Sequence, residues 1–222
     1  MNIKKFTSLV ALIISFLTMN AQQKSYSLLF LGDSYTIGEG VSTEKNYPTQ
    51  LVNALKKEGF AIDKHKIVAK TGWTTGELMQ TLLEDDDVNK YDLVFLCVGV
   101  NNQYRGLDLS IYKKELNTLI NYSLVFASNS SKNVILLSIP DYGFTPFGAA
   151  KKEAISKDID IYNAAKKELA LQSNCQFVDI TPISRNTDIS MVTNDQLHPS
   201  AAQYQKWVNA ILPIAISEMN SK

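Results

Sequence analysis

Short apolar runs rich in β-branched residues recur along the chain at intervals that predict five β-strands. The third and fourth runs are continuously apolar and do not alternate with polar residues. Such runs are typical of parallel strands whose two faces are both covered by helices. The predicted strands lie near Tyr26–Leu31, Lys66–Ala69, Leu93–Val98, Asn133–Ile139 and Gln176–Ile180.

Between the predicted strands, apolar residues recur with the three- or four-residue spacing of amphipathic helices. In the last of these helices we expect Pro213 to cause a kink or a break, because proline lacks the backbone N–H that a helix interior needs. The predicted helices cover roughly Ser110–Ala127 and Lys151–Gln172, and others begin near Pro48, Thr75 and Pro199.

The alternation of strands and helices predicts an α/β fold, a doubly wound parallel sheet with right-handed crossovers. No linker or shift in composition divides the chain, so residues 22–222 are expected to form a single domain. In such sheets, ligands bind at the carboxyl ends of the strands near the point where the strand order reverses. The site is therefore expected at that edge.

Candidate polar residues follow the first three predicted strands. Ser34 follows the first, Gly72 the second and Asn101 the third. In a flavodoxin-like strand order the first strand lies between the second and third, which would place these residues side by side. Asp195 and His198 follow the fifth strand and are expected to fold back over the same edge.

The N-terminal residues have the pattern of a secretory signal peptide. Lys4 and Lys5 precede an uncharged, mostly apolar stretch from Phe6 to Met19, which is followed by Asn20-Ala21-Gln22. Cleavage near Ala21 would make residues 1–21 the signal peptide and export the rest to the periplasm or the medium. The alternative is a retained N-terminal anchor, which the shortness of the apolar stretch disfavours.

Composition excludes some classes of function. The 222 residues carry 22 basic and 22 acidic side chains, so the formal net charge is zero. A balanced charge argues against a nucleic-acid-binding protein. The two cysteines, Cys97 and Cys175, are too few for a disulfide framework, and their predicted strands should not be neighbours. We therefore expect no disulfide bond between them.

Ser34, His198 and Asp195 are the residue types of an acyl-transfer site. A serine hydroxyl becomes nucleophilic when a base takes its proton, and histidine titrates near neutral pH. Asp195 lies three residues before His198, a spacing that lets its carboxylate reach the imidazole Nδ1 on a tight turn. The alternative is that Asp195 caps the last helix and His198 is exposed.

A tetrahedral intermediate also needs donors aimed at its oxyanion. The sequence offers the backbone N–H groups of Ser34 and Gly72 and the side-chain amide of Asn101. Glycine permits close approach of the backbone to a ligand, and asparagine is an uncharged donor. Each of these residues is also common in ordinary turns, so none is decisive alone.

Together these segments resemble the four conserved blocks of the SGNH hydrolases, also called the GDSL lipase/esterase family. The matching segments are Gly32-Asp33-Ser34-Tyr35-Thr36, Lys70-Thr71-Gly72-Trp73-Thr74-Thr75, Gly99-Val100-Asn101-Asn102 and Asp195-Gln196-Leu197-His198-Pro199. They occur in the family's order and span nearly the whole predicted mature chain.

The resemblance implies a flavodoxin-like three-layer α/β/α sandwich with Ser34 as nucleophile, His198 as base and Asp195 as its orienting partner. It also implies an oxyanion hole formed by Ser34, Gly72 and Asn101, and chemistry that needs neither a metal nor another cofactor. One departure concerns Asn102, because this block usually ends in Asp. We expect that change to alter hydrogen bonds within the loop more than catalysis.

The leading hypothesis is a secreted serine esterase that hydrolyses carboxylic esters through an acyl-enzyme, with carbohydrate deacetylation slightly favoured. The substrate would be a small-molecule or carbohydrate ester, and no stable membrane span would remain after processing. The alternatives are a lipase, thioesterase or lysophospholipase, or a non-catalytic glycan- or flavin-binding module. Candidate substrate contacts in the loops are Trp73, Tyr104, Arg105, Tyr142 and Phe144, with Phe147 nearby.

Overall fold

The structure, a computed structural model, describes residues 24–87 and 89–221. The predicted signal peptide, residues 1–21, lies outside the described residues. Within them, no helix is both long and apolar enough to cross a membrane.

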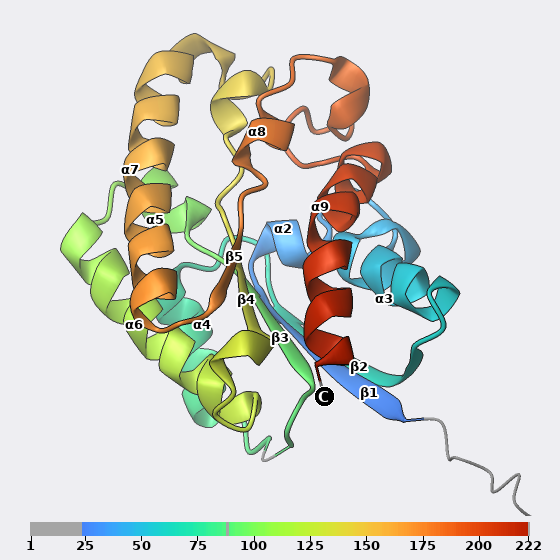
Figure 1. The fold of residues 1–222 in the computed structure, drawn as a ribbon. Helices are drawn as coiled ribbons and strands as arrows, with labels where there is room; N and C mark the ends of the chain where they lie inside the picture. Colours follow the sequence, from blue (N-terminus) through green and yellow to red (C-terminus); the bar gives the residue numbers. More distant parts are fainter. Residues whose placement is uncertain (1–23, 88, 222) are drawn as a thin grey trace, which may run out of the picture.

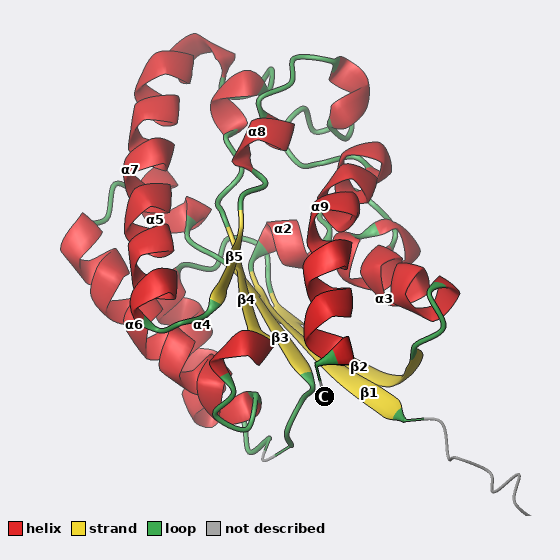
Figure 2. Cartoon of the chain, viewed as in Figure 1, coloured by secondary structure: helices red, strands yellow, loops and turns green. Residues whose placement is uncertain are grey.

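A five-stranded parallel sheet forms the centre of the fold, with helices on both of its faces (Figures 1 and 2). The strand order is β2-β1-β3-β4-β5, which confirms the predicted α/β class and places β1 between β2 and β3. The strands are β1 (Ser25–Gly32), β2 (Ala61–Ala69), β3 (Leu93–Cys97), β4 (Val134–Leu137) and β5 (Gln176–Val178).

The longer helices form two layers. Helices α3 and α9 pack together on one face, and α4, α6 and α7 form a row on the other (Figure 1). These helices are α3 (Tyr47–Lys57), α4 (Thr75–Glu84), α6 (Leu109–Phe126), α7 (Lys152–Gln172) and α9 (Ala201–Asn220), and the short helices are α2 (Ser34–Ile37), α5 (Val100–Tyr104) and α8 (Thr181–Ser184).

The core lies where the sheet meets these layers. Every residue of β3 and β4 is buried, as expected for central strands covered on both faces. Phe30 of β1 stacks on Phe95 of β3 with ring centroids 4.7 Å apart. Cys97 and Cys175 are both free, and β4 separates β3, which carries Cys97, from β5, which follows Cys175.

Pro213 does not end the last helix, so of the kink or break that we expected, the break does not occur. Helix α9 continues from Ala201 to Asn220 with Pro213 inside it. Pro213 and Asn209, whose carbonyl loses its helical partner, are both exposed. Water can therefore satisfy that carbonyl, while buried Ile211 and Ala215 hold the helix against the core.

Candidate active site

Ser34 lies on the sharp turn between β1 and the short helix α2. Asp33 caps α2 by accepting a hydrogen bond from the Tyr35 N–H at 3.0 Å. The preceding Gly32 has no room for a side chain, because a Cβ there would overlap the Thr36 hydroxyl and the Cys97 carbonyl. This turn therefore places the serine at the carboxyl edge of the sheet, next to the end of β3.

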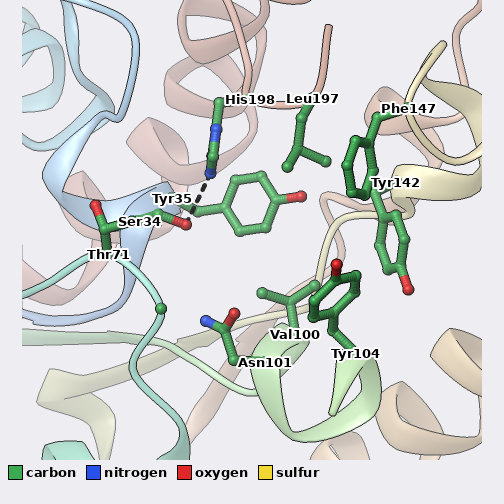
Figure 3. A pocket seen from close by; sticks show the side chains of 11 residues that line it. Ser34, Tyr35, Thr71, Val100, Asn101, Tyr104, Tyr142, Phe147, Leu197 and His198 are labelled. Atoms are coloured by element: carbon green, nitrogen blue, oxygen red, sulfur yellow. Dashed lines mark hydrogen bonds between the residues drawn. The ribbon is translucent and has the colours of Figure 1, made fainter. Parts of the chain in front are cut away.

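Ser34, His198 and Asp195 form one hydrogen-bonded chain. The His198 Nε2 lies 2.9 Å from the Ser34 Oγ (Figure 3). The His198 Nδ1 lies 2.7 Å from the Asp195 Oδ2. The alternative role for Asp195 does not hold, because Ser200 caps α9. The structure thus brings together three side chains that the sequence separates by up to 164 positions.

The turn that carries Asp195 holds this carboxylate in its ionised form. The Asp195 Oδ1 accepts hydrogen bonds from the backbone N–H groups of Leu197 and His198, both at 2.9 Å, and from the Thr193 hydroxyl at 2.7 Å. Burial alone would raise the pKa of Asp195, but these hydrogen bonds and the one from His198 outweigh it and lower the pKa to about 2. The Asp195 carboxylate is therefore ionised at neutral pH and can accept a hydrogen bond from the His198 Nδ1–H.

A buried charge network lies beneath the serine. Burial raises the pKa of Asp33 to about 7, although the Tyr35 N–H and nearby Lys166 oppose this rise. Lys166 comes from α7, is fully buried and donates to the Val98 carbonyl at 3.1 Å. Burial in turn lowers the pKa of Lys166. The hydrogen bond from Lys166 ties the segment after β3 to helix α7.

Ser34, Gly72 and Asn101, the three predicted oxyanion-hole residues, all line the pocket that contains the Ser34 hydroxyl. The Ser34 and Gly72 backbone N–H groups have no acceptor in the described part of the chain. Asn101 donates one amide N–H to the Trp73 carbonyl at 2.9 Å, which fixes the orientation of the amide and leaves its second N–H free. Gly72 has a φ of +83°, which glycine adopts readily. The predicted oxyanion residues are therefore adjacent and have N–H groups to donate.

Asn102 makes structural contacts that an aspartate would not reproduce. Its side chain is fully buried, accepts from the Thr75 N–H at 3.0 Å and donates to the Thr75 hydroxyl at 2.6 Å. The Thr75 hydroxyl in turn donates to Glu115 at 2.5 Å. Asparagine supplies both a donor and an acceptor here, which explains how the loop beside Asn101 is held without the aspartate usual in this block.

A pocket of about 200 Å³ opens beside the serine, and its far wall is apolar and aromatic (Figure 3). Tyr104 and Tyr142 line it, as predicted, together with Phe147. Four further lining residues were not predicted from the sequence, although each is next to a predicted site residue in the chain, and that position is the signal that could have identified them. They are Tyr35, Thr71, Val100 and Leu197.

The other predicted substrate contacts, Trp73, Arg105 and Phe144, do not line this pocket. Trp73 packs against the core. Arg105 donates to the Gly72 carbonyl at 2.5 Å and pairs with Glu77, so it orients the glycine rather than facing the pocket. The Phe144 ring lies under the Lys152 ammonium group, 3.7 Å from its centroid.

This arrangement has the parts of an acyl-transfer site: a serine hydrogen-bonded to a histidine, a carboxylate behind it and converging N–H donors. A family model described as GDSL-like Lipase/Acylhydrolase matches residues 30–206. The chain belongs to this family. It is accordingly a carboxylic ester hydrolase, and the resemblance to SGNH hydrolases is confirmed.

Relatives of known activity match most of the chain. An arylesterase from Vibrio mimicus is 29% identical over 203 residues, covering 90% of this chain and 92% of the relative. An acetylxylan esterase from Geobacillus stearothermophilus is 26% identical over 207 residues, covering 83% and 91%. The crystal structure of Axe2, an acetylxylan esterase from that organism, has a TM-score of 0.67 at 21% identity over 86% of this chain and 94% of its own, which confirms the fold.

We predict that Asn102→Asp destabilises the fold in a pH-dependent way. The new carboxylate would be buried next to Glu115, and both effects raise its pKa above the ordinary value of about 4. The folded variant would then hold a proton more tightly than the unfolded chain, so its stability relative to the parent falls as pH rises from about 4 to 8. We expect a loss of about 1–3 kcal/mol at pH 8.

Thermal unfolding followed by circular dichroism at pH 5 and pH 8 tests this prediction. Asn209→Asp is the matched control, because Asn209 is exposed on α9 and a carboxylate there stays in water. A decrease in Tm of the same size at both pH values, or none, would contradict the role given to Asn102.

Proposed function

We propose that this chain is a serine esterase that hydrolyses esters of short acyl groups through a covalent acyl-enzyme on Ser34. The hydrogen-bonded chain from Asp195 through His198 to the Ser34 hydroxyl carries the proposal. Ionised Asp195 accepts from the His198 Nδ1–H, which leaves Nε2 free to accept the serine proton.

In the first step the Ser34 Oγ attacks the ester carbonyl carbon while the His198 Nε2 takes the hydroxyl proton. The carbonyl oxygen becomes an oxyanion that accepts hydrogen bonds from the Ser34 and Gly72 N–H groups and the free N–H of Asn101. The carbon–oxygen bond to the alcohol then breaks, and His198 gives its proton to the departing alcohol oxygen.

In the second step water replaces the alcohol. The His198 Nε2 takes a proton from this water as its oxygen attacks the acyl carbon, and the same donors hold the second oxyanion. The bond to Ser34 breaks, His198 returns the proton to the Ser34 Oγ and the carboxylic acid leaves. No step consumes a reagent other than ester and water.

The shape of the pocket favours a short acyl group. Its volume is about 200 Å³, and the rings of Tyr104, Tyr142 and Phe147 bound it on the side opposite Ser34 (Figure 3). The names of two relatives, arylesterase and acetylxylan esterase, support small esters and acetylated sugars as candidate substrates. A lipase would need a longer apolar groove than this pocket provides.

We further propose that the enzyme is exported. The support is the sequence of residues 1–21, in which a basic start precedes a short apolar stretch. Expression of the full chain in a bacterial host with a secretion pathway should yield protein outside the cytoplasm whose N-terminus lies near residue 22, as read by mass spectrometry. Full-length chain confined to the cytoplasm would contradict export.

We predict that Ser34→Ala lowers kcat for p-nitrophenyl acetate by on the order of 10³-fold or more, because the nucleophile is lost. Steady-state kinetics provides the measurement, and circular dichroism verifies the fold of the variant. Ser217→Ala is the matched control, since Ser217 is exposed on α9, and its kcat should equal that of the parent. Activity that survives Ser34→Ala would refute the proposed mechanism.

A further inference from the structure

A second cavity adjoins the catalytic pocket on the outer side of its aromatic wall. This cavity measures about 380 Å³ and lies between α5 and the first turns of α7. Tyr104, Tyr142 and Phe147 line both spaces, whereas Ser34 and His198 line only the catalytic pocket. One substrate could therefore place its ester in the catalytic pocket and another part of itself in the second cavity, where that part would not touch Ser34 or His198.

The aromatic wall is unusually exposed for such large side chains. Tyr104 is 59% exposed and Phe147 is 50% exposed, although their rings contact each other and Tyr142 at centroid distances of 6.1–6.3 Å. An exposed cluster of aromatic rings beside a polar rim is typical of a binding surface. Its flat faces suit the C–H faces of a sugar ring.

Apart from the aromatic rings, the second cavity is lined by three polar side chains, Gln103, Lys151 and Asp158, and by small or apolar residues, which are Gly148, Ala150, Ala154 and Ile155. In Figure 3 the Tyr142 hydroxyl points away from Ser34, and it donates to the Gln103 Oε1 at 2.9 Å. The Gln103 Nε2 donates in turn to the Asp158 Oδ2 at 3.3 Å. This hydrogen-bonded chain orients the Asp158 carboxylate at the cavity and leaves its Oδ1 as an acceptor. Lys151 adds a donor at the rim.

These polar groups favour the alcohol half of a sugar ester over the acyl chain of a fatty ester. An alkyl acyl chain in the second cavity would remove water from the Asp158 carboxylate and give it no hydrogen bond in return, which is unfavourable. A polyhydroxylated group would donate to Asp158, accept from Lys151 and cover the aromatic rings. The polar groups of the lining therefore favour a sugar over a fatty chain.

We propose that the second cavity is a subsite for the sugar part of an acetylated carbohydrate, whose acetyl group occupies the catalytic pocket. This assignment rests on the proposed esterase function. Tyr104, Tyr142 and Phe147 form the platform for the sugar ring, and Asp158 accepts from its hydroxyl groups. The subsite binds the alcohol half of the substrate and takes no part in the bond changes at Ser34.

The test compares kcat/KM for mono-O-acetyl xylobiose with kcat/KM for p-nitrophenyl acetate, which lacks a sugar. Asp158→Ala should lower the ratio of the two values about tenfold, mainly through KM of the sugar ester, because a hydrogen bond to a charged group is lost. Glu153→Ala is the matched control, since this exposed carboxylate on the same helix lies outside the cavity, and the ratio should not change.

A second variant tests occupancy of the cavity. Ala154 is exposed and lines the cavity, so Ala154→Trp should fill it without disturbing the core and should also lower the ratio at least tenfold. Ratios that stay at the parental value in either variant overturn the proposal. The proposal is also overturned if the variants lose activity on p-nitrophenyl octanoate and keep their activity on the sugar ester, because the cavity would then hold acyl chains.

The same kinetic measurements distinguish a failure of the sugar-subsite proposal from a failure of the proposed esterase mechanism. A parent enzyme that hydrolyses p-nitrophenyl acetate but not mono-O-acetyl xylobiose overturns the sugar subsite alone. An enzyme whose hydrolysis of p-nitrophenyl acetate survives Ser34→Ala overturns the esterase mechanism, and the subsite assignment falls with it.

Discussion

The strand order of the parallel sheet is the constraint on which the site depends. Because β1 lies between β2 and β3, the segments that follow these strands emerge side by side at one edge. Ser34, Gly72 and Asn101 lie on those segments, so they line one pocket although they are far apart in the sequence. A strand order that placed another strand between β1 and β2, or between β1 and β3, would separate a donor from the serine.

Asp195 and His198 reach the same edge of the sheet on a turn that is held by its own hydrogen bonds. One oxygen of Asp195 accepts from the turn's backbone and from Thr193, and the other accepts from His198. The carboxylate thus organises the loop and orients the imidazole at the same time. That double use explains why a partly exposed carboxylate on a loop can serve a site that needs fixed geometry.

The fold and the polar centre of the site could be predicted from the sequence because each rests on a local pattern. Apolar runs mark the strands, and Ser34, Gly72 and Asn101 directly follow such runs. The pocket wall was harder to predict, since the direction of a loop side chain depends on tertiary partners. Arg105 turns toward the Gly72 carbonyl and Glu77, while Tyr35, beside the nucleophile, turns into the pocket. The continuity of α9 through Pro213 likewise depends on which side of the helix faces water.

The central claim is that Ser34 is the nucleophile activated by His198. Its most direct test is reaction with a p-nitrophenyl phosphonate ester, followed by intact-protein mass spectrometry and peptide mapping. We expect one phosphonyl group per chain, attached to Ser34, with loss of esterase activity in proportion to labelling. Esterase activity that is lost while Ser34 stays unmodified, or phosphonylation of another residue that accounts for the loss, would contradict the claim.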